Sequence, residues 1–206
     1  PGWRSLFRSL RNPKSGFMAL FGFASGLPFA LFLGTLYAWF TEAEVDLETM
    51  GVFSLIGLAY SFQFLWSPLV DKVDIPFLRR LGKRKQWIAP AQLLLGIILV
   101  TMSLLDPKSS LGWFSLLAGI GAFTSATQDI AINAWRIDIA DDEATIDILS
   151  TVYQMGFRLS SLVGGALGLI IAARIGWPQT YVMLGLILLA IGVAGLFAPD
   201  PDKTSA

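Results

Sequence analysis

Long apolar blocks alternate with short polar connections along the whole chain. The blocks cover approximately residues 15–40, 49–70, 87–105, 111–138, 146–173 and 178–198. A bilayer core requires about 20 apolar residues per helix, so each block is long enough to cross a membrane. The pattern predicts an all-α membrane protein whose six spans occupy residues 1–198, with residues 199–206 as the start of an inter-domain linker.

Composition supports this class and excludes several others. Only 15% of the 206 residues are charged, whereas soluble domains have about 25%. Cys and His are absent, which excludes disulfides and thiolate metal sites and leaves Asp, Glu or Arg for any proton relay. No phosphate-binding loop, nucleophile elbow or metal-ligand spacing occurs, and no basic face suits nucleic acid. The sequence therefore predicts neither an enzyme nor an ATP-driven pump, and no cofactor.

The basic residues predict the orientation of the spans. One side of the membrane holds 12 of the 15 Lys and Arg residues, namely Arg4, Arg8, Arg11, Lys14, Lys72, Arg79, Arg80, Lys83, Arg84, Lys85, Arg136 and Lys203. Cytoplasmic loops carry such an excess, so both termini are expected in the cytoplasm.

The fourth block contains an ionisable residue, Asp129, nine residues before Asp138 and therefore about 13 Å deep. A carboxylate at the centre of a span costs about 3 kcal/mol, so it usually faces a cavity and serves transport. Ser125 and Asn133 lie one turn away on the same face, and Thr124 and Gln128 broaden it. The alternative interpretation of this polar face is a set of interhelical hydrogen bonds.

The fifth block carries Tyr153, Gln154 and Arg158. Consecutive spans run antiparallel, so Arg158 is expected at a depth comparable to that of Asp129, where the two could form an ion pair. Such a pair is either a permanent contact that fixes the helix register or a switch that opens when Asp129 takes a proton or substrate arrives.

Two further stretches carry polar or helix-breaking residues. In the first block, Ser25, Gly26 and Pro28 indicate a loosened helix of the kind that lines transporter sites, or alternatively close packing through small residues. Tyr37 and Trp39 are expected in an aromatic belt at the outer interface. After the second block, four residues predict a cytoplasmic charge latch, for which ordinary positive-inside anchoring is the alternative: Asp71, Lys72, Gly82 and Arg84.

These motifs resemble the major facilitator superfamily, in which six spans with a cytoplasmic N-terminus form one of two halves. They are most similar to AmpG-type muropeptide permeases. The stretches that carry this similarity are Gly22–Pro28, Phe64–Asp71, Ser125–Ile130 and Ala134–Asp138, and two of the motifs also resemble acetyl-CoA transporters.

The resemblance implies a bacterial inner-membrane importer of GlcNAc-1,6-anhydro-MurNAc and its peptide-bearing forms. Import would serve cell-wall recycling, draw on the proton gradient and feed the signal that induces β-lactamase. The implied partners are the sugar–peptide substrate, protons, the bilayer and a C-terminal half of the same transporter.

Carried over to this sequence, the family's proton-coupling residues are Asp129 and Arg158, and Gln128, Ser25 and Gly26 lie near the sugar. Asn133, Tyr153 and Gln154 complete the expected substrate-binding set. The family usually has a second Asp where this chain has Asn133, so coupling rests on Asp129 alone, is disabled, or works differently here. The rival interpretations are an importer of another substrate, such as acetyl-CoA or a peptide, and a non-transporting scaffold.

Overall fold

The computed structural model describes residues 3–4, 7, 11–44, 52–76, 81–106, 109–142 and 144–199, and these contain helices but no strand. The predicted linker at 199–206 lies outside the described residues except for Pro199.

The first apolar block forms one rod with a change of helical pitch inside it. Helix α2 (Pro13–Ala30) begins at Asn12, whose side chain accepts a hydrogen bond from the Lys14 backbone N–H at 3.0 Å. The rod continues through a π-helical turn, Leu31–Thr35, into α3 (Leu36–Glu42). Pro28 lies inside α2 and lacks an N–H, which loosens the hydrogen-bond ladder just before the π-helical turn.

The second block differs from the prediction, because the expected span 49–70 is not one continuous helix. Helix α4 (Val52–Ser61) is followed by a 3₁₀ turn, Gln63–Leu65, and by the short α5 (Ser67–Lys72). Phe62 and Trp66 flank the turn with non-helical backbone angles, and Pro68 lies in the first turn of α5, where its missing N–H costs nothing. Residues 49–51 lie outside the described part.

The remaining helices agree closely with the predicted blocks. They are α6 (Lys85–Ser103), α7 (Leu111–Ile139), α8 (Ile146–Leu162) and α10 (Trp177–Gly195). Helix α8 runs through a second π-helical turn, Val163–Leu167, into α9 (Gly168–Ile175). By length and composition, three described helical segments are apolar enough to cross a membrane: 85–103, 146–175 and 177–195.

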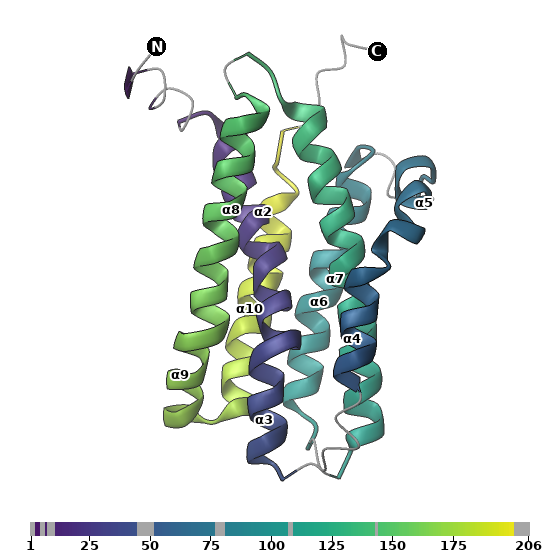
Figure 1. Cartoon of the computed structure of the whole chain (residues 1–206), viewed down its shortest axis with the longest axis vertical. Helices are drawn as coiled ribbons and strands as arrows, with labels where there is room; N and C mark the ends of the chain where they lie inside the picture. The colour runs from purple at the N-terminus through teal and green to yellow at the C-terminus, as the bar shows by residue number, and fades with distance from the viewer. Residues whose placement is uncertain are drawn as a thin grey trace.

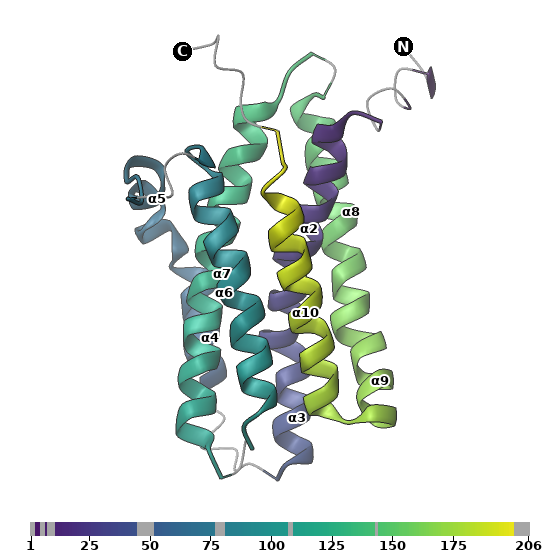
Figure 2. The same cartoon turned by 180° about the vertical axis from the view of Figure 1, so that it is seen from behind.

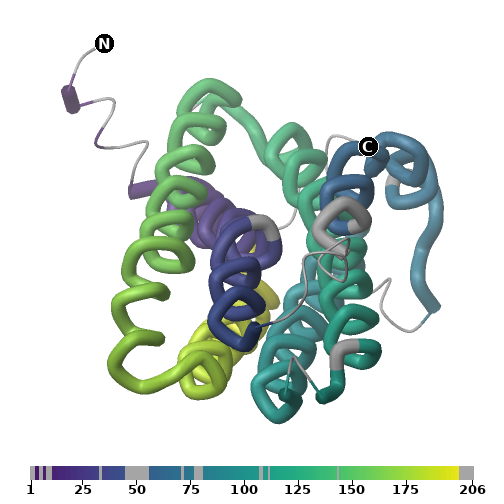
Figure 3. The backbone as a smooth tube through the Cα atoms, turned by 60° about the horizontal axis from the view of Figure 1, so that its bottom comes forward, coloured from purple at the N-terminus to yellow at the C-terminus, as the bar shows by residue number. Residues whose placement is uncertain are grey.

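Two closely packed helix pairs organise the bundle. Helix α2 lies against α8, and α6 lies against α10 at the back of the bundle in Figure 1 and at its front in Figure 2. Glycines allow the second contact, because a Cβ on Gly185 would lie only 2.9 Å from the Gly96 carbonyl oxygen. Helix α7 contacts both α4 and α6, and in Figure 3 α2 and α3 lie between the α8–α9 rod and α7.

The core divides into two apolar clusters, one toward each end of the bundle. Near α3, Trp39 stacks on Tyr181 at 4.7 Å between ring centroids and meets Phe114 edge-on at 4.9 Å. Trp39 is only 5% exposed, so this residue belongs to the core rather than to a lipid-facing belt, whereas Tyr37 is 49% exposed. Near the start of α2, the Phe21 and Trp135 rings are 5.0 Å apart. We call the end of the bundle near α3 the Glu42 end and the end near the start of α2 the Lys14 end.

Candidate functional site

The polar residues of α7 lie on a buried face, as their spacing predicted. Thr124, Ser125, Gln128 and Asp129 are at most 9% exposed, and Asn133 is partly buried. The Asn133 amide donates to the backbone carbonyl of Asp129 at 2.8 Å, which directs this side chain along its own helix.

Asp129 lies where four helices converge. Its carboxylate interacts electrostatically with Ser25 of α2, Tyr60 of α4 and Tyr153 of α8. Its Oδ1 atom is inaccessible to solvent and has no hydrogen-bond partner among the described residues. A buried carboxylate with spare hydrogen-bonding capacity is poorly suited to hold helices together and well suited to bind a proton or a hydroxyl donor.

A chain of buried amides extends from this site through the bundle. Gln128 donates to the Gln92 side chain of α6 at 2.6 Å, and Gln92 donates to the Leu188 carbonyl of α10 at 3.1 Å. Gln92 was not among the predicted site residues, although an amide inside the apolar third block is a usable signal. Gln128 Oε1 has no hydrogen-bond partner among the described residues, so one acceptor stays available beside Asp129.

Helix α4 and the turn after it are connected to α7 by two side-chain hydrogen bonds. The Tyr60 hydroxyl donates to Ser125 at 2.7 Å, and the Trp66 indole donates to Thr127 at 3.0 Å. Side chains before and after the break in the second block therefore both contact α7.

The predicted ion pair between Asp129 and Arg158 is absent from the described part of the chain, which corrects that expectation. The buried face of α8 is formed by Leu149, Val152, Tyr153, Gly156 and Ser160. Arg158 is two residues beyond Gly156, about 200° around the helix, so Arg158 and Gln154 are exposed on the opposite face. The cation near Tyr153 is instead Arg136, whose guanidinium carbon lies 5.6 Å from the centre of the Tyr153 ring.

Ser25 and Gly26 occupy the buried side of α2, and their surroundings differ. Ser25 faces Asp129 and Tyr153, and both of these side chains interact with its hydroxyl. A Cβ on Gly26 would overlap Ser160 and lie 2.7 Å from the Phe157 carbonyl oxygen. Gly26 therefore permits close packing of α2 on α8, which is the alternative interpretation given for this motif.

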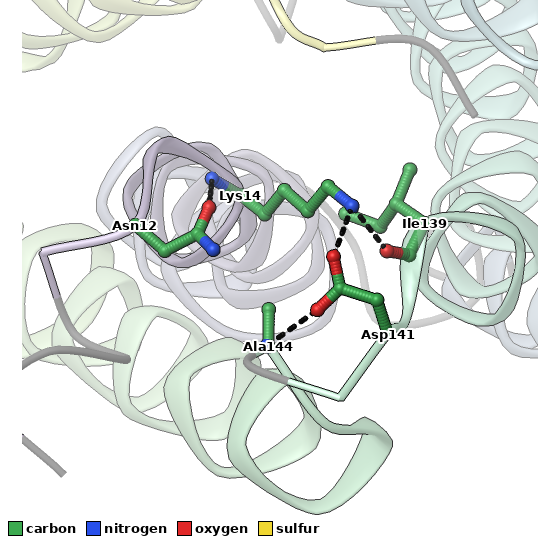
Figure 4. Close-up of polar contacts among 5 residues, drawn as sticks. All are labelled: Asn12, Lys14, Ile139, Asp141 and Ala144. Carbon is green, nitrogen blue, oxygen red and sulfur yellow. Dashed lines mark hydrogen bonds and ion pairs between the residues drawn. The ribbon is translucent and has the colours of Figure 1, made fainter. Parts of the chain in front are cut away.

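Charged residues tie the helices together at the Lys14 end. Arg84 pairs with Asp138 at the end of α7 at 2.8 Å. Lys14 bonds to Asp141 at 2.7 Å and to the Ile139 carbonyl at 2.9 Å, and Asp141 also accepts from the Ala144 N–H (Figure 4). Lys85 donates to the Ala198 carbonyl at 2.8 Å.

Of the predicted charge latch, the structure describes the side chains of Lys72 and Arg84 and the backbone of Gly82. Gly82 adopts a positive φ of 110°, which turns the chain toward Arg84, and Lys72 is exposed. The side chain of Asp71 lies outside what the structure describes. Asp138 is one acidic partner of Arg84 and was not among the residues predicted for the latch. No cluster of three or more metal-ligating side chains occurs among the described residues.

Comparison with known proteins points to membrane permeases. A family model described as "Acetyl-coenzyme A transporter 1" matches residues 17–112. The anhydromuropeptide permease of Escherichia coli K12 is 41% identical over 96% of this chain and 40% of its own length. A putative transporter AmpG 4 of Rickettsia conorii is 37% identical over 82% of this chain and 41% of its own length.

The chain thus spans about two fifths of the length of these relatives. They are named as permeases and transporters rather than as enzymes. Together with the apolar helices, these matches show that the chain is a multi-pass bacterial inner-membrane protein and belongs to the AmpG family of permeases within the major facilitator superfamily.

Proposed function

We propose that residues 1–198 are the N-terminal, six-span half of a proton-coupled importer of anhydro-muropeptides. The observation that carries the substrate class is the 41% identity, over 96% of the chain, to a protein named anhydromuropeptide permease. The observation that supports proton coupling is the buried, incompletely bonded carboxylate of Asp129.

Six spans fit the lengths of the rods. At 1.5 Å per residue, the rod Pro13–Glu42 is about 45 Å long and α7 about 43 Å, and both exceed a hydrocarbon core of about 30 Å. The α4–α5 segment is the remaining span, with its break close to the Lys14 end. The polar face of α7 lowers the mean hydropathy of that helix, and the π-helical turn after α2 interrupts the regular α-helix of the first rod. Both features are in keeping with a transport path.

A cytoplasmic location of both termini fits the distribution of charge. The described basic residues at the Lys14 end include Lys14, Lys72, Lys83, Arg84 and Lys85, whereas Arg174 lies in α9, toward the Glu42 end. Basic residues favour the cytoplasmic side, so the Glu42 end faces outward.

In this proposal Asp129 takes up the proton that drives import. Gln128, Ser25, Asn133 and Tyr153 form the sugar side of the site, and Gly26 positions Ser25 through the close packing of α2 on α8. The exposed polar face of α8, with Gln154 and Arg158, lies on the surface that the C-terminal half of the longer protein covers, and Arg158 meets the substrate's carboxylates there. The import would return cell-wall fragments to the cytoplasm and feed β-lactamase induction, which links it to antibiotic resistance.

The test is uptake of labelled GlcNAc-anhydro-MurNAc into vesicles that carry the full-length protein, with and without a protonophore. Asp129→Asn should lose uphill accumulation and keep exchange across the membrane, while the exposed control Asp106→Asn should accumulate substrate normally. Protonophore-sensitive accumulation by Asp129→Asn would refute the coupling role, and no uptake by the unsubstituted protein would refute the substrate.

Transport of acetyl-CoA is the second candidate, favoured by the family model that matches residues 17–112. Acetyl-CoA carries several phosphate charges, whereas the described interior around Asp129 offers a carboxylate, hydroxyls and amides, with Arg136 beside Tyr153 as a single nearby cation. This composition suits a sugar better than a nucleotide. Competition of labelled muropeptide uptake by unlabelled acetyl-CoA would separate the two.

A further inference from the structure

A cavity of about 490 Å³ opens between α3, α9 and the start of α10 at the Glu42 end, far along the bundle from Asp129. Its lining residues are Tyr37, Ala38, Thr41, Glu42, Leu169, Ala173 and Trp177. Small-molecule sites have volumes of about 300–1,000 Å³, with mostly apolar walls and a few polar groups. The cavity fits that description, and none of the residues assigned to the transport site lies in it.

Glu42 is the one charged residue among the described residues that line this cavity. Glu42 accepts a hydrogen bond from the Trp177 indole N–H through Oε2. No other hydrogen bond to Glu42 occurs among the described residues, so Oε1 is available to a ligand. Trp177 itself is held by stacking on Trp39, with ring centroids 6.2 Å apart and an interplanar angle of 12°. The acceptor is therefore fixed in place by a buried aromatic cluster.

The chemistry of the walls selects a neutral hydroxyl-bearing ring. A pyranose has an apolar C–H face that packs on aromatic and aliphatic side chains, here Tyr37, Trp177 and Leu169. Its hydroxyl groups donate strong hydrogen bonds to a carboxylate. None of the described lining residues is Lys or Arg, and the Glu42 carboxylate repels a ligand carboxylate or phosphate.

We infer that this cavity is an outer subsite for the neutral N-acetylhexosamine ring of an incoming muropeptide, with the Glu42 carboxylate accepting its hydroxyl protons. The inference rests on the proposed function for the identity of the sugar and for the outward orientation of the Glu42 end. The anionic lactyl or peptide part of the substrate stays outside this cavity. That part, at the other end of the substrate from the N-acetylhexosamine ring, reaches the central site first.

Binding is tested with methyl N-acetyl-β-glucosaminide and the purified full-length protein in nanodiscs, using ligand-observed saturation-transfer NMR. Glu42→Gln keeps an oxygen that accepts the Trp177 N–H, so the fold should be retained, and an unchanged thermal unfolding midpoint verifies this. The loss of a hydrogen bond to a charged acceptor should weaken binding by about tenfold. Asp106→Asn, the control at the same end, should bind like the unsubstituted protein. Equal signals from Glu42→Gln and the unsubstituted protein, or no signal from either, would overturn the inference.

Uptake kinetics separate this inference from the proposed function. In right-side-out vesicles, Glu42→Gln should raise the KM for GlcNAc-anhydro-MurNAc about tenfold at constant maximal rate and leave uptake of anhydro-MurNAc alone unchanged. Glu42-dependent binding of the glucosaminide without any muropeptide uptake would support the subsite and refute the import. Gradient-driven uptake whose KM is unaffected by Glu42→Gln would support the import and refute the subsite.

Discussion

The contact between α2 and α8 is made backbone to backbone at two glycines, and Gly156→Ala tests what it contributes. A Cβ on Gly156 would overlap the Ala19 carbonyl oxygen and lie 3.0 Å from the Phe23 backbone nitrogen. In the reverse direction, a Cβ on Gly22 would overlap the Tyr153 carbonyl oxygen. Because the opposing atoms are backbone, no side chain can rotate away, and the added methyl group has to separate the helices.

The cost of this separation can be isolated with a second glycine. Overpacking a tight contact costs about 1–3 kcal/mol, while Ala stabilises a helix interior by about 1 kcal/mol relative to Gly. Gly119 lies inside α7 with no atom within 4 Å of an added Cβ, so Gly119→Ala carries only the second effect. The propensity contribution cancels between the two variants. Gly156→Ala should therefore be about 1–3 kcal/mol less stable than Gly119→Ala.

The measurement is reversible unfolding of the purified full-length protein in mixed micelles, followed by far-UV circular dichroism as the denaturing detergent fraction increases. Gly156→Ala should also reduce gradient-driven uptake, since separating α8 from α2 moves Tyr153 away from Ser25 and Asp129. Equal unfolding free energies for the two variants would refute the packing argument. Normal uptake by a destabilised Gly156→Ala would show that the α2–α8 spacing does not control the site.

Three further substitutions probe the hydrogen bonds described above. Gln92→Leu leaves the buried Gln128 amide without its acceptor and should lower the unfolding free energy by about 1–3 kcal/mol, and the double substitution with Gln128→Leu should recover most of the loss in the same titration. Lys14→Met removes a partly exposed ion pair, with side chains 21% and 46% exposed, and a hydrogen bond to the Ile139 carbonyl, so it should cost about 1–2 kcal/mol, with a smaller difference at high salt. Asn133→Asp replaces an amide that donates to the Asp129 carbonyl with an ionised carboxylate, which cannot donate, so the unfolding free energy should fall by about 1 kcal/mol. Protonophore-sensitive uptake should persist with either residue at position 133. Uptake only in the Asp version would instead assign coupling to position 133.

The helices were largely predictable from the sequence because apolar length and polar interruption report directly on where a span begins and ends. The fourth block was expected at 111–138 and α7 is Leu111–Ile139, and the fifth was expected at 146–173 and its helical segment covers 146–175. The break in the second block was not predicted. Its residues remain apolar through Phe62, Phe64 and Leu65, so hydropathy alone cannot distinguish a 3₁₀ turn from a continuing helix, although Pro68 marks where the next helix starts.

Part of the site was also predictable, namely the part that one helix determines. Ser125, Asp129 and Asn133 share a face because their spacing matches the helical repeat. The partners that α7 meets on other helices, Tyr60 and Gln92, depend on how those helices are rotated in the bundle, which no local pattern contains. Gln92 still had a local signal, since a polar side chain inside an apolar span needs a buried partner in the third block as much as in the fourth.

Arg158 illustrates why depth alone was insufficient. The number of residues from the membrane boundary gives the depth of a side chain, and by that measure Arg158 and Asp129 were expected to meet. Which way a side chain points depends on which face of its helix is buried, and for α8 that face is set by Gly156 and Tyr153 packing on α2. The same packing directs Tyr153 toward Asp129 and Arg158 away from it. The named relatives are about two and a half times as long as this chain, and an exposed arginine at that depth needs a covering surface, which the additional length of such a protein would supply. The position of Arg158 is thus better explained by the half-transporter proposal than by a pair within this bundle.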